Sequence, residues 1–97
     1  MKVGYSPRSI SDIEGIADYL KERSVRAPAA MESAIRTTVQ LIAEFPKCGR
    51  AVEQRTGVRV IPLGRYPYLV FYTIQDETAV ILHIRHGSRM PLEPDEL

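Results

Sequence analysis

Apolar residues recur at two different spacings along the chain, and the change of spacing divides the chain in two. Between Ile10 and Phe45 they return every three or four positions, which places them on one face of an α-helix. Beyond Val58 they form runs rich in β-branched and aromatic residues, which is typical of strands. The pattern therefore predicts helices in the first half and a sheet in the second.

The first predicted helix carries one apolar stripe and begins at a serine. Ser9 or Ser11 is expected to cap it, because a serine hydroxyl can accept a hydrogen bond from a free amide of the first turn. Asp12 and Glu14 lie off the stripe, so we expect them to face solvent. The stripe consists of Ile10, Ile13, Ile16, Ala17 and Leu20.

The second predicted helix runs from Pro28 to about Phe45. Proline suits the first helical position, because the amide hydrogen that it lacks would have no partner there. Pro46 ends the helix. Because the connection between the two helices is short, they must be antiparallel neighbours. The second apolar stripe consists of Met31, Ala34, Ile35, Thr38, Leu41, Ile42 and Phe45.

Four strands are expected around these helices. Val3 and Tyr5 alternate with polar or small neighbours, which predicts a short opening strand. The connections 64–67 and 75–78 have the length of hairpin turns, so the last three strands form an antiparallel meander. These strands are expected at 58–63, 68–74 and 79 to about 85. The predicted fold class is therefore α+β, an antiparallel helical hairpin packed on an antiparallel sheet in the order β-α-α-β-β-β.

The totals predict one small domain without a membrane segment. A chain of 97 residues is too short to bury two cores, so residues 1–97 are expected to form a single domain. It has neither a long apolar run nor a secretory signal pattern, so we expect a cytoplasmic protein with no membrane partner. Cys48 is the only cysteine, which excludes an internal disulfide and a cysteine-based zinc site. No metal and no cofactor are expected.

The net charge of +1 conceals an uneven distribution. Residues 1–44 are balanced, residues 45–90 carry seven basic against three acidic groups, and the last seven residues carry three acidic groups. A cationic second half suits an anionic partner, either nucleic acid or an acidic protein surface. The alternative is that these arginines form an ordinary solvated surface.

An ordered set of short phrases spans nearly the whole chain. They are Tyr5-Ser6-Pro7-Arg8 followed by Asp12-Ile13 and Ile16-Ala17-Asp18-Tyr19-Leu20, then Ile42-Ala43-Glu44-Phe45-Pro46 with Gly49-Arg50, Leu69-Val70-Phe71-Tyr72, and Ile84-Arg85-His86-Gly87-Ser88-Arg89. Together with the order of elements, this set resembles the RelE/ParE toxin superfamily, and its ParE side most. The resemblance implies a type II toxin–antitoxin system, in which a cognate ParD-like antitoxin blocks the toxin in a hetero-oligomer.

RelE-like members of the superfamily cut messenger RNA on the ribosome. That chemistry needs a proton acceptor, a proton donor and cations that hold the phosphate. RelE-like sequences usually carry an arginine where this chain has Leu69, and a tyrosine or histidine where this chain has an acidic tail. If this chain is a nuclease, its candidate residues are His86, Arg85 and Arg89.

ParE-like members poison DNA gyrase without chemistry of their own, and this resemblance suits the chain better. The toxin is then a binding protein rather than an enzyme. A third alternative is a family member that binds its antitoxin and is not toxic. The candidate surface for the target consists of Arg59, Arg65, Tyr66, Tyr68, Arg85 and Arg89. The candidate surface for the antitoxin lies on the helical hairpin and consists of Ile13, Leu20, Ile35 and Leu41.

Overall fold

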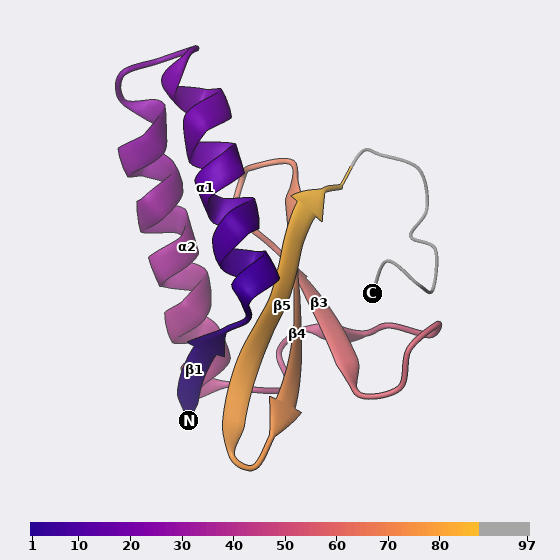
Figure 1. The fold of residues 1–97 in the computed structure, drawn as a ribbon. Coiled ribbons are helices and arrows are strands. Elements are labelled where there is room, and N and C mark those ends of the chain that lie inside the picture. Colours follow the sequence, from indigo (N-terminus) through magenta and orange to yellow (C-terminus); the bar gives the residue numbers. More distant parts are fainter. Residues whose placement is uncertain (88–97) are drawn as a thin grey trace.

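The computed structural model describes residues 1–87, which form two helices and five strands (Figure 1). In chain order they are β1 (Lys2–Tyr5), α1 (Pro7–Lys21), α2 (Ala27–Glu44), β2 (Arg50–Ala51), β3 (Val58–Pro62), β4 (Tyr68–Gln75) and β5 (Thr78–His86). The predicted fold class and order are confirmed. The two-residue β2 is an addition, because it lies in a polar stretch without strand periodicity. No helix within residues 1–87 has the length and hydropathy needed to cross a bilayer.

The first helix begins earlier than predicted. Its N-cap is Ser6, whose Oγ accepts a hydrogen bond from the Ser9 amide at 3.0 Å. Pro7 follows as the first helical residue, where a proline costs no hydrogen bond. Ser9 lies inside the first turn and donates its hydroxyl to the Ser6 carbonyl at 2.8 Å. The predicted cap at Ser9 or Ser11 is therefore wrong, because the serine directly before the proline takes that role.

The strands form one sheet in the order β1-β5-β4-β3-β2. The meander of β3, β4 and β5 is antiparallel, as predicted, but β1 pairs with β5 in parallel. The sheet is therefore mixed. The helical hairpin returns the chain to the end of the sheet where it began, since the Met1 amino group donates to the Ala43 carbonyl at 3.0 Å. Strands β3, β4 and β5 then alternate in direction, so β5 runs parallel to β1.

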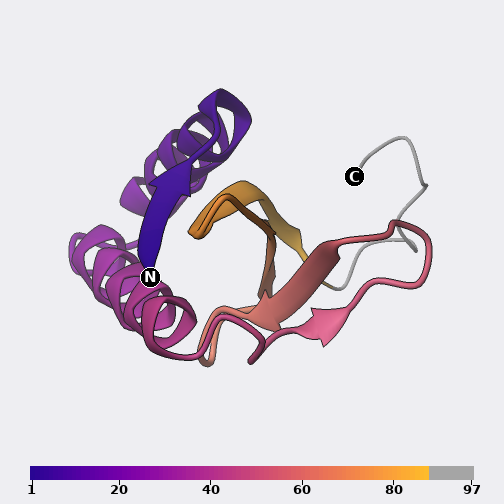
Figure 2. The same ribbon diagram turned by 90° about the horizontal axis from the view of Figure 1, so that it is seen from below.

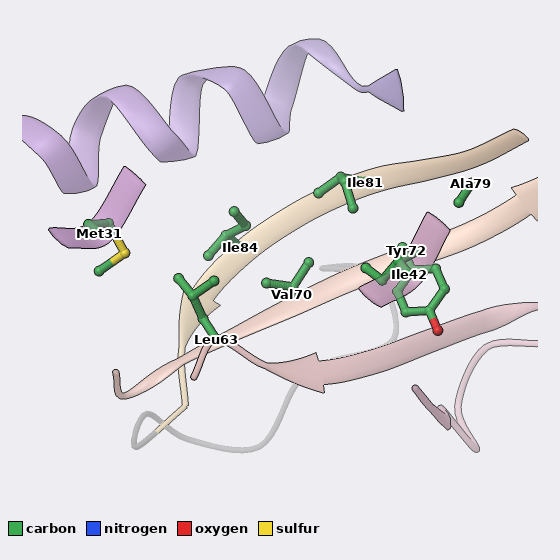
Figure 3. Packing of buried hydrophobic residues seen from close by; sticks show 8 residues of the cluster. All are labelled: Met31, Ile42, Leu63, Val70, Tyr72, Ala79, Ile81 and Ile84. Atoms are coloured by element: carbon green, nitrogen blue, oxygen red, sulfur yellow. The ribbon is translucent and has the colours of Figure 1, made fainter. Parts of the chain in front are cut away.

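The core lies on both faces of the sheet. The larger cluster lies between the helices and the sheet, and Figure 3 shows its eight buried residues. The smaller cluster, Val58, Val60 and Phe71, lies on the opposite face. Phe71 is 1% exposed and Tyr72 is fully buried, so β4 is covered on both faces, as predicted for the central strand. Seen from below, the helices lie along one side of a curved sheet (Figure 2).

A β-bulge interrupts the alternation of β5. Phe71 pairs with His83 and Tyr72 pairs with Ile81, so Leu82 has no direct partner on β4. Ile81 and Ile84 both belong to the larger cluster, although they are three positions apart. The extra residue therefore shifts by one the positions of β5 that face the larger cluster. As a result, His83 points to the other face of the sheet, where its ring stacks on Phe71.

The loop after α2 is held by one buried hydroxyl. Tyr72 donates to the Pro46 carbonyl at 2.8 Å and accepts the Gly49 amide at 2.8 Å. In Figure 3 this oxygen points away from α1. Burial raises the pKa of the Tyr72 phenol above its usual value, so the group stays a donor at neutral pH. A Cβ on Gly49 would lie 2.7 Å from the tyrosine ring, so only glycine fits here.

The β4–β5 turn offers a test of backbone strain. Asp76 and Glu77 both adopt positive φ, at 48° and 63°, although neither is glycine. Replacing Glu77 by glycine is expected to raise the free energy of unfolding by about 0.5–1 kcal/mol, because a left-handed conformation costs an L-residue more than it costs glycine. Urea unfolding followed by circular dichroism measures the change. Glu77→Ala keeps the Cβ and should bring no gain; an equal gain in both variants would assign the effect to charge instead.

Candidate functional site

A groove of about 860 Å³ lies between α1 and the ends of β4 and β5. One wall consists of α1 residues, and the other of the β3–β4 turn and the last residues of β5. The lining is both apolar and charged. Its polar members include Arg8, Asp12, Tyr19, Tyr66, Tyr68, Arg85 and His86.

The groove exists because β1 is shorter than β5. Strand β1 pairs with β5 only as far as Ile81, so the remaining part of β5 has α1 as its neighbour on that side. Side chains from the start of α1 satisfy the backbone there. The Ser6 hydroxyl donates to the Leu82 carbonyl at 2.7 Å, and the Ile84 amide donates to Asp12 Oδ2 at 3.0 Å. The prediction that Asp12 faces solvent is therefore wrong.

Two contacts fix the end of β5 at the groove. The Gly87 amide donates to the Pro67 carbonyl at 2.7 Å, which joins β5 to the β3–β4 turn. The rings of Tyr68 and His86 meet edge to face, with centroids 5.4 Å apart and an interplanar angle of 78°. This arrangement holds the imidazole and the phenol in the same wall.

The charges of the groove favour an acidic partner. Arg8 and Arg85 bring two positive charges to the described lining against the single carboxylate of Asp12, which accepts the Ile84 amide. At the outer end, the Arg23 guanidinium lies 3.7 Å from the centroid of the Tyr19 ring. Arginine beside aromatic rings is the composition of protein-interface anchors, because both give much contact area for little lost conformational entropy.

Part of the predicted target surface gathers at this groove. Tyr66, Tyr68 and Arg85 line it, together with His86. Arg65 is exposed in the same turn as Tyr66. Arg59 lies elsewhere: it is on β3, the strand on the far side of β4 from β5, and its guanidinium donates to the carbonyls of Lys47 at 3.3 Å and Gly49 at 2.7 Å. It therefore supports the loop after α2. Arg89 lies outside the described residues.

The predicted antitoxin surface is mostly turned inward. Ile13, Leu20 and Ile35 are partly buried and pack against the larger cluster of the core. Leu41 is 41% exposed. Leu20 also lines the groove. Three of the four predicted residues therefore contribute to the core, and their contact with an antitoxin stays a prediction.

Sequence reasoning missed the helical wall of the groove. Arg8, Asp12 and Tyr19 lie on α1 with Gly15 between them, at intervals of three or four residues. That spacing places them on one helix face and was the available signal. It was hidden because the apolar stripe of the same helix dominates the periodicity.

The described residues differ at one position from the pattern that RelE-like sequences usually carry. Leu69, at the position of the RelE-like arginine, packs against the apolar cluster around Phe71. His86 is the one imidazole in the lining. Among residues 1–87 no group of three or more histidine, cysteine, aspartate or glutamate side chains is arranged to bind a metal ion.

A family model supplies the assignment. The model of the ParE toxin of the type II toxin–antitoxin system parDE matches residues 3–91. The chain belongs to the ParE toxin family. As a member of the ParE/RelE toxins, it is the toxin component of a type II toxin–antitoxin system, in which the partner is an antitoxin.

Relatives of this ParE-family toxin match it over most of their length. It is 30% identical to Toxin RelE2 of Caulobacter vibrioides over 90 residues, which cover 92% of this chain and 98% of that protein. It is 28% identical to Toxin RelE1 of the same organism, over 84% of this chain and 88% of that one. Among solved structures it resembles a chain of the chromosomal ParDE toxin–antitoxin system from P. aeruginosa, with a TM-score of 0.65, 21% identity, and coverage of 89% of this chain and 95% of that chain.

Proposed function

We propose that this toxin inhibits DNA gyrase by binding it through the groove, without catalysing a reaction of its own. The observation that carries the proposal is the lining, in which Arg8 and Arg85 stand among the phenol rings of Tyr19, Tyr66 and Tyr68. Such a wall suits contact with an acidic protein surface. The family match is to a ParE toxin, and gyrase is the target that the resemblance to ParE-like members implies.

The neutralising partner is proposed to be a ParD-like antitoxin that forms a hetero-oligomer with the toxin in the cytoplasm. Leu20 in the groove and the exposed Leu41 are apolar residues of the hairpin that the partner can contact. An acidic segment of the antitoxin would meet Arg85. The partner thus gains both apolar and charged contacts.

The test is supercoiling of relaxed plasmid by purified gyrase, with and without the purified toxin. We expect lost supercoiling and accumulation of cleaved DNA complex. Addition of the co-expressed antitoxin should restore activity. Gyrase that is unaffected by a toxin that still arrests growth would overturn the proposed target.

A second candidate is a ribosome-dependent messenger RNA endoribonuclease. Two observations favour it: the relatives are named RelE toxins, and His86 lies beside Arg85 in the groove. A nuclease should stop translation within minutes of induction, whereas a gyrase poison should trigger DNA damage signalling while translation continues. His86→Ala should abolish toxicity of a nuclease, because the proton carrier is lost. If expression without antitoxin is harmless, the chain is a non-toxic antitoxin-binding member.

A further inference from the structure

His83 is a buried imidazole for which the proposed function has no use. It lies on β5 at the bulge and is 1% exposed. Its ring stacks on Phe71 with centroids 4.6 Å apart and planes 6° from parallel. Among residues 1–87, neither Nδ1 nor Nε2 has a hydrogen-bond partner. A buried polar group without a partner is costly, so an unpaired ring at this place needs an explanation.

We propose that His83 is an acid-sensitive joint of the groove: when its ring takes up a proton, the end of β5 that carries Arg85 and His86 loosens. The regulatory consequence rests on the proposed function, since it treats the groove as the partner surface. The structural step does not depend on that assignment.

The surroundings of His83 oppose protonation of its ring. Burial lowers the pKa of His83 below its ordinary value, and Arg8 of α1, Arg85 of β5 and Arg55 before β3 act in the same direction. Among these groups, Asp12 of α1, whose carboxylate binds the amide of the next residue, favours the protonated ring. From β4 the apolar face of Phe71 stacks on the ring. A protonated His83 must therefore leave its site or attract Asp12.

Both responses act on the groove. His83 directly precedes Ile84, and the Ile84 amide is held by the Asp12 carboxylate at 3.0 Å. If Asp12 turns towards a protonated ring, this bond between α1 and β5 is lost. If the ring leaves, the stack on Phe71 that holds the bulge is lost. In either case Arg85 and His86 lose their fixed position opposite α1, so acid weakens partner binding.

The direction of the pH effect follows from linkage. Above about pH 6.5 the ring is neutral in the closed and the opened protein, and the closed form has its full stability. As the pH falls below 6.5, the opened form takes up the proton and the closed form resists it, so stability is lost down to the lowered pKa of the closed form. One pH unit below 6.5 allows at most about a tenfold increase of opening.

The experiment is hydrogen exchange of the amides of Ile84, Arg85 and His86 in the full chain without partner, at pH 7.0 and 5.5, corrected for the intrinsic pH dependence of exchange. In the unaltered protein we expect opening to increase up to about tenfold at pH 5.5. His83→Phe keeps a flat ring on Phe71 and should show no increase. His86→Gln, which removes the other histidine of the chain, should keep the increase.

An equal increase in the unaltered protein and in His83→Phe would overturn the proposal. If His83→Phe does not fold, NMR titration of the His83 ring in the unaltered protein decides the matter. The proposal is supported if the ring stays neutral below pH 6.5 and takes up its proton only where amide exchange at the end of β5 accelerates. It is refuted if the ring titrates at pH 6.5 or above while amide exchange is unchanged. Binding of partner at pH 7.5 tests the proposed function separately, because the ring is neutral there.

Discussion

Replacing Tyr72 by phenylalanine is expected to lower the free energy of unfolding by about 2–4 kcal/mol. The change removes the acceptor of the Gly49 amide and the donor to the Pro46 carbonyl, both at 2.8 Å. Tyr72 is fully buried and Gly49 is buried, so water does not readily replace the lost bonds. A buried donor without a partner costs more than the bond itself contributed. Urea unfolding at neutral pH, followed by circular dichroism, measures the loss.

Tyr19→Phe is the matched control. The Tyr19 ring is 49% exposed, and the contact of Arg23 with its face needs no hydroxyl. This variant should change stability by less than about 0.5 kcal/mol. If Tyr72→Phe is as mild as the control, the loop after α2 must have another anchor, and the donor pair of Arg59 to Lys47 and Gly49 is the first to examine.

Reversing the charge of Arg85 is expected to abolish toxicity. Arg85→Glu places a carboxylate in the wall of the groove near Asp12, which turns an attractive surface into a repulsive one for an acidic partner. The loss of a central interface arginine costs 2 kcal/mol or more in binding, which is roughly a 30-fold fall in affinity. Colony formation after induction without antitoxin and the supercoiling assay both report the change.

The control for this prediction is another arginine outside the groove. Arg36 of α2 is exposed and pairs with Glu32 at 2.6 Å, an interaction that contributes little to stability. Arg36→Glu should therefore stay toxic. Thermal unfolding of both variants shows whether each is folded. A folded Arg85→Glu toxin with unchanged toxicity would remove the groove from the proposed mechanism.

The hydrophobic pattern alone predicted the two helices and four of the five strands that the structure describes. The predicted strands at 58–63 and 68–74 agree with Val58–Pro62 and Tyr68–Gln75, because β-branched and aromatic runs bounded by turn residues leave few alternatives. The two helices followed from their apolar stripes in the same way. The lengths of the connections then fixed the helical hairpin and the meander, since both need only neighbouring segments.

Tertiary structure decided the groove. The parallel pairing of β1 with β5 joins residues that are more than 70 positions apart, and no local pattern encodes it. Its early end at Ile81 leaves β5 open to α1, which gives Asp12 a backbone amide to bind. The bulge at Leu82 likewise depends on how two strands meet, and it places His83 against Phe71 of the smaller cluster. Periodicity determines which face of a helix or strand is apolar. Long-range pairing of the strands determines which polar side chains come together in a site.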